Sequence, residues 1–112
     1  MKKIGKEIEA FMIKLYILKT LNKRSNYPYA MYKNLENIIK KKVKLDDELL
    51  IRLKDDFYNN IKLLEEKNYI KRKNSKNNKT FYSITKKGKE VLSDIKSSIK
   101  RYIDELNELI GV

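Results

Sequence analysis

The sequence of 112 residues contains no cysteine and no histidine. Without cysteine there is no disulfide framework and no thiolate chemistry. Without histidine the chain lacks the usual general base near neutral pH and the commonest metal ligand. The other residues suggest no nucleophile–base pair, no metal-ligand cluster and no Gly-rich phosphate loop. We therefore expect a protein that is not an enzyme and that holds no metal or other cofactor.

Long apolar runs are also missing. The most apolar stretch, Phe11 to Leu21, is interrupted by Lys14, Lys19 and Thr20. It is too short and too broken to span a bilayer. No small-residue cleavage site follows it, so a secretory signal is not indicated. The sequence predicts a cytoplasmic protein without a membrane partner.

Positive charge is abundant. The chain carries 27 Lys plus Arg against 15 Asp plus Glu, a formal net charge of +12. This excess favours polyanionic partners, nucleic acid first and anionic membrane surfaces second. Hydrophobic residues make up 41% of the chain, which is enough to build a core despite the high charge. The length suits one domain, spanning residues 1–112.

Apolar residues recur at steps of three and four in four segments, which is the period of amphipathic helices. The predicted helices cover residues 4–22, 28–41, 46–67 and 85–110. The apolar stripe of the first helix is wider than one packed face needs, so this helix is expected to contact a second surface as well as its own core.

Several residues indicate where these helices begin. Pro28 suits the first turn of the second helix, and Asn26 is a candidate cap for that turn. Asp46 and Thr85 are the expected N-caps of the third and fourth helices, and Asn68 can adopt the left-handed conformation that closes the third helix. A single third helix and a helix broken near Asp55 are both compatible with the sequence.

A short hairpin is predicted between the third and fourth helices. Residues 69–73 and 80–84 have strand-like content, and residues 74–79 between them are rich in turn formers. The resulting fold is mostly α with a small β-hairpin. The order of elements is that of a winged helix-turn-helix, with residues 69–84 as the wing and a long C-terminal dimerisation helix.

Both end helices carry apolar residues beyond those a core needs. In the last helix these residues repeat every 3.5 positions, the seam pattern of a coiled coil. A two-fold dimer would cover them, and packing of the two end helices within one subunit is the alternative. The expected interface residues are Ile8, Phe11, Met12, Leu15, Leu92, Ile95, Ile99, Tyr102, Ile103, Leu106 and Leu109.

Three segments carry a resemblance to a known family. Residues 56–70 read DFYNNIKLLEEKNYI, and residues 81–89 read FYSITKKGK. The first is similar to the third helix of PadR-type transcriptional regulators, where a Leu-Tyr pair and spaced leucines precede Glu-Glu-x-Gly-Leu-Ile. The second resembles the Tyr-x-Leu-Thr-x-x-Gly end of that family's wing. Residues 28–31, which read PYAM, are less closely similar to the Gly-Tyr-x-Ile motif at that family's second helix.

The chain departs from this family at several positions. Asp55-Asp56 and Asn59 stand where the family usually has Gly-Thr and Pro, and Asn68 stands where it has Gly. The segment between the second and third helices is also longer. The resemblance covers nearly the whole chain and implies a winged helix-turn-helix regulator whose end helices build a dimer.

The candidate DNA contacts lie on the wing and on the helix-turn-helix. From Lys67 to Lys89 there are nine basic residues and no acidic one, as suits a hairpin that follows phosphates. Outward-facing Asn and Lys on the third helix can pair with adenine and guanine. A merely solvated surface is the alternative. The predicted DNA-binding residues are Tyr29, Lys33, Tyr58, Asn59, Lys62, Lys71, Arg72, Lys73, Lys76 and Lys79.

The leading hypothesis is a homodimeric regulator that binds specific double-stranded DNA, with recognition helices about 34 Å apart or a multiple of that. One alternative is a non-specific, chromatin-type DNA-binding protein. Another is a protein-interaction module built on a winged helix. The sequence specifies neither an operator nor an effector.

Overall fold

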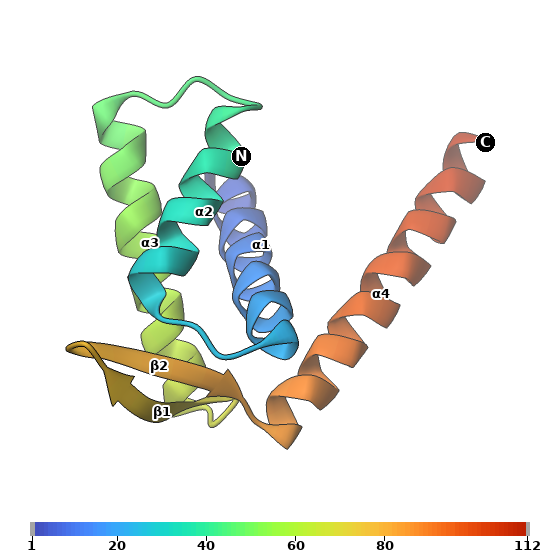
Figure 1. Ribbon diagram of the computed structural model, residues 1–112. Coiled ribbons are helices and arrows are strands. Elements are labelled where there is room, and N and C mark those ends of the chain that lie inside the picture. The colour runs from blue at the N-terminus through green and yellow to red at the C-terminus, as the bar shows by residue number, and fades with distance from the viewer. Residues whose placement is uncertain (1, 112) are drawn as a thin grey trace.

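The apolar stripes of the first three helices meet in one core. The computed structural model describes the backbone of residues 2–111 and the side chains of residues 9–111. Its elements are α1 (Lys2–Lys23), α2 (Pro28–Lys40), α3 (Asp47–Glu66), β1 (Ile70–Lys76), β2 (Lys79–Ile84) and α4 (Lys86–Ile110). Figure 1 shows α1, α2 and α3 side by side, the hairpin across one end of them, and α4 leaving that end. The predicted winged helix-turn-helix class is confirmed.

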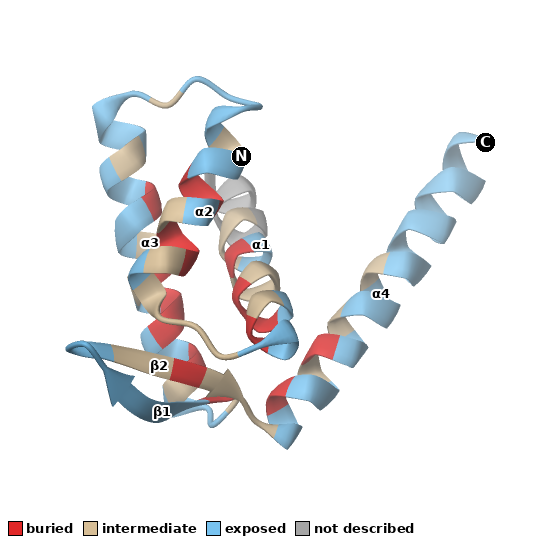
Figure 2. Ribbon diagram, in the orientation of Figure 1, coloured by how far each residue is buried: buried red, intermediate tan, exposed pale blue. Residues whose placement is uncertain are grey.

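The core lies where α1, α2 and α3 face one another, as the buried positions in Figure 2 show. Ile17, Leu18, Phe57 and Leu64 are completely buried at its centre. Ile70 and Tyr82 bring the hairpin into the same core. The hairpin is therefore held against the helices by apolar burial as well as by hydrogen bonds.

The third helix is continuous. It runs from Asp47 to Glu66 without a break near Asp55. The Asp46 side chain accepts a hydrogen bond of 2.8 Å from the backbone N–H of Leu49, which confirms the predicted N-cap. A 20-residue helix is about 30 Å long, so its two ends lie in different parts of the molecule.

The predicted cap at Asn26 is wrong. The Tyr27 backbone holds the N-cap position of α2, without a side-chain capping bond, and Pro28 follows in the first turn as expected. Asn26 instead pairs with β2, because its N–H donates to the Tyr82 carbonyl (3.1 Å) and its carbonyl accepts from the Tyr82 N–H (2.8 Å). Through this bridge Asn26 acts as a third, one-residue strand beside β2.

The hairpin turn is tighter than predicted. The strands extend to Lys76 and from Lys79, so the turn consists of Asn77 and Asn78 rather than of residues 74–79. Both asparagines adopt positive φ values, 53° and 61°, as a two-residue type I′ turn requires. A bulge between Arg72 and Ser75 keeps the antiparallel strands in register on either side.

A single junction connects α3, the hairpin and α4. Asn68 ends α3 with φ 62°, the left-handed conformation expected of it. The Thr85 N–H donates to the Tyr69 carbonyl (3.0 Å), and the Thr85 hydroxyl donates to the Asn68 carbonyl (2.7 Å). The same hydroxyl accepts from the Gly88 N–H (3.0 Å), which confirms Thr85 as the N-cap of α4.

Beyond this junction α4 stands away from the other helices. Leu92 is buried and Ile95 packs against the core, whereas residues 100–111 are all exposed. The radius of gyration is 15.5 Å, compared with about 13 Å for a compact chain of this length. Figure 1 shows the gap that opens between α1 and the C-terminal half of α4.

Replacing Gly88 by alanine is expected to destabilise the fold. A Cβ at this position would meet the Tyr69 carbonyl oxygen and lie 2.8 Å from Cγ1 of Ile84. Alanine normally stabilises a helix interior relative to glycine, but this overpacking should cost about 1–3 kcal/mol instead. Urea unfolding measures the effect, with the exposed Ser93→Ala as control. A Gly88→Ala protein as stable as the wild type would contradict the close packing.

Candidate nucleic-acid interface

Most basic side chains of the wing lie on its outer strand, β1. Strand β2 lies between β1 and the Asn26 bridge, which leaves β1 at the edge. Residues 71–76 of β1 are all exposed. Charged side chains on an edge strand oppose pairing with another sheet. On this edge Lys71, Lys73 and Lys76 lie in solvent, where a phosphate backbone could reach them.

Two of the predicted wing contacts interact within the chain. Arg72 Nε lies 2.8 Å from Glu65 Oε2, and this carboxylate raises the pKa of the guanidinium. Lys79 Nζ lies 3.4 Å from the Tyr27 hydroxyl and 4.6 Å from the centre of its ring. Lys71, Lys73 and Lys76 form no ion pair with residues 9–111.

The predicted contact Lys33 also has an acidic neighbour. Glu36 is buried on α2, with its Oε1 3.2 Å from Lys33 Nζ and 2.8 Å from Lys40 Nζ. Lys40, followed by the Tyr32 hydroxyl and Lys33, lowers the pKa of Glu36 to about 2 although burial opposes the change. Desolvation and this carboxylate raise the pKa of Tyr32 to about 12. Glu36 thus cancels much of the positive charge on this part of α2.

The predicted α3 contacts divide into two kinds. Asn59 and Lys62 are exposed, as a reading face requires. Tyr58 is half-buried, because its ring packs against Tyr32 (6.2 Å between centres) and Phe57 (5.4 Å). Burial raises the pKa of the Tyr58 hydroxyl. Tyr58 therefore presents less of its surface to a ligand than Asn59 does. The exposed tyrosine of this region is Tyr29, 57% accessible at the start of α2.

Helix α3 is acidic within a basic protein. Its 20 residues contain six acids and three bases, a formal charge of −3. Asp47 and Glu48 in the first turn interact favourably with the helix dipole. Arg52 is engaged by Glu9 (3.0 Å) and Asp56 (4.0 Å). Positive charge on α3 is left chiefly to Lys54 and Lys62.

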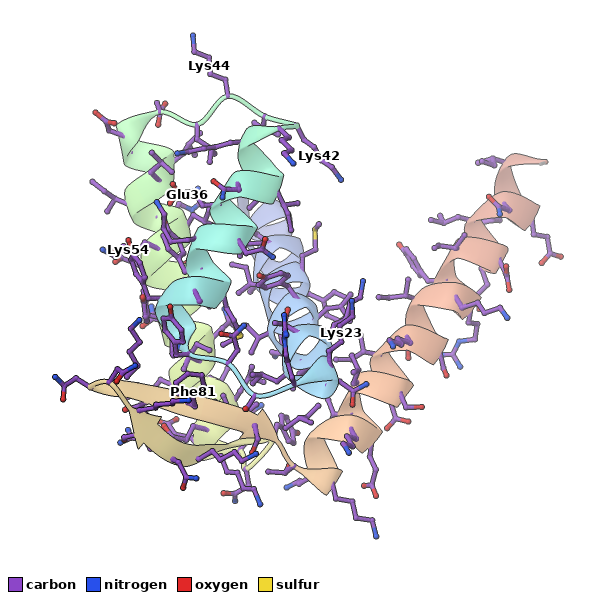
Figure 3. The ribbon with its side chains drawn as sticks, viewed as in Figure 1. Lys23, Glu36, Lys42, Lys44, Lys54 and Phe81 are labelled. Atoms are coloured by element: carbon purple, nitrogen blue, oxygen red, sulfur yellow. The ribbon has the colours of Figure 1, made fainter. Side chains whose placement is uncertain are left out.

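Lys54 is a candidate that sequence reasoning missed. It is exposed on the outer side of α3, where Figure 3 labels it. Its position one helical turn before Tyr58 was the available signal, since residues four apart share a helix face. Glu65 was missed as well. It pairs with Arg72 across the α3–wing boundary and also accepts from the Tyr82 hydroxyl at 3.4 Å.

Most of the predicted interface residues lie on the side of the molecule where α1 and α4 diverge. Phe11 and Met12 of α1 are exposed, and Leu15 is half-buried. Leu92 lies in the chain's own core, so its side chain is already covered. A groove between α1 and α4 is lined in part by Phe11, together with Ile99, Tyr102 and Ile103. Leu106 and Leu109 continue this exposed seam, and the Ile8 side chain lies outside the described residues.

Other kinds of site find little support in the described part of the chain. No three acidic side chains there gather closely enough to hold a metal ion. None of the helices described has the length and apolar character needed to cross a membrane.

The fold and the exposed wing define a winged-helix protein with a protruding C-terminal helix. A family model described as "Protein of unknown function (DUF3116)" matches residues 31–97. Because the match spans more than half of the chain, the protein belongs to this family. No curated protein matches the chain.

Solved structures with the same fold include PadR-family transcriptional regulators. A transcriptional regulator from Clostridium thermocellum is 18% identical with a TM-score of 0.72, covering 91% of this chain and 93% of that one. A PadR-family regulator from Clostridium difficile is 23% identical with a TM-score of 0.62, covering 89% and 98%. One from Eggerthella lenta is 16% identical with a TM-score of 0.68, covering 97% and 87%. The predicted PadR-like fold is confirmed.

Glu36→Gln is expected to remove a pH-dependent part of the stability. The pKa of Glu36 falls from 4.5 to about 2 on folding. Its stabilisation is therefore complete above pH 4.5 and is lost as the pH falls toward 2. Because both lysine partners are about half exposed, the free energy of unfolding of the wild type should exceed that of the variant by about 1–3 kcal/mol at neutral pH. Near pH 2 the two free energies should differ by little. Urea unfolding across this range measures it, and a difference independent of pH would contradict the ion pairs.

Proposed function

We propose that this protein is a transcriptional regulator that binds specific double-stranded DNA as a homodimer. The observation that carries the proposal is the exposed outer strand of the wing, whose Lys71, Lys73 and Lys76 have no acidic neighbour between Lys67 and Lys89. Several solved proteins with this fold are described as transcriptional regulators, which supports the same role here.

The wing and α3 contribute differently to the proposed binding. Lysines on a hairpin neutralise phosphates, which supplies affinity without sequence preference. Asn59 and Lys62 offer donors and acceptors to base edges. Glu48 and Asp55 are exposed on the N-terminal half of α3 and would be repelled by phosphates. The proposed contact is therefore centred on the C-terminal half of α3, beside the wing.

The proposed dimer accounts for the uncovered seam of α4. Tyr102, Ile103, Leu106 and Leu109 are between 42% and 83% exposed, and α1 diverges from them. A contiguous apolar surface of this kind is unfavourable in water unless a partner covers it. A second copy presents the same seam together with Phe11 and Met12, as a two-fold interface requires. Two wings would then bind one duplex.

DNA binding is tested with the upstream region of the protein's own gene and a scrambled duplex, by fluorescence anisotropy over a salt series. Four phosphate contacts per subunit predict a slope of log affinity against log salt of about −7. The double variant Lys73→Gln/Lys76→Gln should reduce the magnitude of this slope by about 2 per subunit on both duplexes. Asn59→Ala should instead reduce discrimination between them by about 1–3 kcal/mol.

The matched control is Lys96→Gln/Lys100→Gln, which removes the same charge from exposed positions on α4. This control should leave the slope unchanged. A wild-type slope near zero, or an equal effect of both lysine pairs, would overturn the proposed wing contact.

A second candidate function is non-specific, chromatin-type DNA binding. The net acidity of α3 favours it, because an acidic recognition helix contributes less to base readout than the basic wing does to phosphate contact. Equal affinity for the two duplexes, with the wing effect retained, would select this alternative.

The dimer is tested by Leu106→Glu. A charge placed in the proposed seam should turn a dimer into a monomer at micromolar concentration, because a buried unpaired carboxylate is costly. Sedimentation equilibrium measures the mass. Ser97→Glu, on the opposite side of α4, adds the same charge and should leave the dimer intact. A wild-type chain that sediments as a monomer would rule out this interface.

A further inference from the structure

The groove between α1 and α2 has the chemistry of an anion site. It has a volume of about 460 Å³ and lies between the C-terminal half of α1, the turn that follows it, and one flank of α2. We propose that this groove binds a small, acceptor-rich anion that carries a phosphate or carboxylate group. The site is separate from the wing, and its occupancy by a free small anion does not depend on the proposed DNA binding.

The groove follows from helical spacing. Lys19 and Lys23 lie four residues apart on α1 and so project from the same face. Ala30 and Asn34 repeat the same spacing on the facing side of α2. Because Ala30 has only a methyl group, the two helices leave space between them at this level.

The charges around the groove have one sign. Lys19, Lys23 and Arg24 line it, and no acidic residue does. None of the three forms an ion pair with any of residues 9–111. Lys33 and Lys40 on the other flank of α2, in contrast, share the buried Glu36. Figure 3 shows Glu36 directed toward α3 and Lys23 at the opposite side, near the end of α1.

Hydrogen bonds within the groove engage the Tyr16 hydroxyl and the side-chain oxygen of Asn26, and they leave amide hydrogens. The Tyr16 hydroxyl donates to the Met31 carbonyl (2.9 Å) and accepts from Asn34 Nδ2 (2.9 Å). Asn26 Oδ1 accepts from the Tyr27 N–H (2.8 Å). The amide nitrogens of Asn26 and Asn34 each have hydrogens beyond these bonds. A ligand rich in acceptors would match these amide donors and the three cationic side chains.

The same chemistry could come from a free small molecule or from a phosphate of bound DNA. Titrations of the full chain with inorganic phosphate, citrate and a short duplex, at constant ionic strength, distinguish these sources. The side-chain amide signals of Asn26 and Asn34 in NMR spectra report directly on the groove. We expect saturable shifts of both signals with phosphate or citrate.

Two pairs of variants test the assignment. Lys23→Ala/Arg24→Ala should weaken anion binding at least about tenfold, whereas Lys41→Ala/Lys42→Ala removes the same charge from exposed positions outside the groove and should not. Asn34→Asp should also weaken it by placing a carboxylate in the lining of the groove, with Asn37→Asp, equally exposed on α2 but outside the groove, as control.

The possible outcomes are distinct. Saturable shifts with the small anions, lost in the groove variants alone, support a free ligand. Shifts with duplex alone, lost in the same variants, support a DNA phosphate as the occupant. Shifts that do not saturate, or equal losses in groove and control variants, overturn the site. A loss of DNA binding in the wing variants would leave the shifts with phosphate and citrate unchanged and would remove only those that depend on bound duplex.

Discussion

The close contact of Gly88 with the Tyr69 carbonyl is the constraint on which both ends of the molecule depend. The chain leaves α3, forms the hairpin and enters α4 within a small volume, where Thr85 bonds to Asn68, Tyr69 and Gly88. A side chain at Gly88 would push the start of α4 away from the start of β1. The direction of α4 and the position of the wing are therefore set together, and the proposed dimer would fix the relative placement of two wings through this one junction.

The distribution of charge is as important as its excess. Two buried or half-buried acids, Glu36 and Glu65, hold basic side chains within the chain and reduce their local charge. Helix α3 adds a net negative charge of its own. Basic groups without such neighbours line the outer strand of the wing and the α1–α2 groove, and others, such as Lys62 and Lys96, lie elsewhere on the surface. The attraction of a polyanion to a given face therefore depends on which basic groups there lack an acidic partner, and not on the net charge of +12 alone.

Helices α1 and α4 both carry apolar side chains that the chain itself leaves exposed. On α4, the residues beyond Ile99 continue the apolar repeat while losing all contact with the core. On α1, one side packs into the core, another lines the groove with α2, and Phe11 and Met12 are exposed. The unusually wide apolar stripe of α1 thus includes Phe11 and Met12, which the chain itself leaves exposed. The proposed dimer and the proposed anion site use different levels of this one helix, Phe11 and Met12 in its N-terminal half and Lys19 and Lys23 toward its C-terminal end.

The sequence by itself determined the element order, the caps at Asp46 and Thr85 and the left-handed end at Asn68, because helix periodicity and capping depend on residues within one or two turns. It also indicated the acid-free wing. Only the tertiary structure decided that Asn26 pairs with Tyr82, that Tyr58 packs against Tyr32, that Leu92 belongs to the core and that Glu65 engages Arg72. It likewise kept α3 continuous and joined α1 to α2 in a donor-rich groove. These features arise from contacts between surfaces whose relative positions are set by packing, which local sequence patterns do not specify.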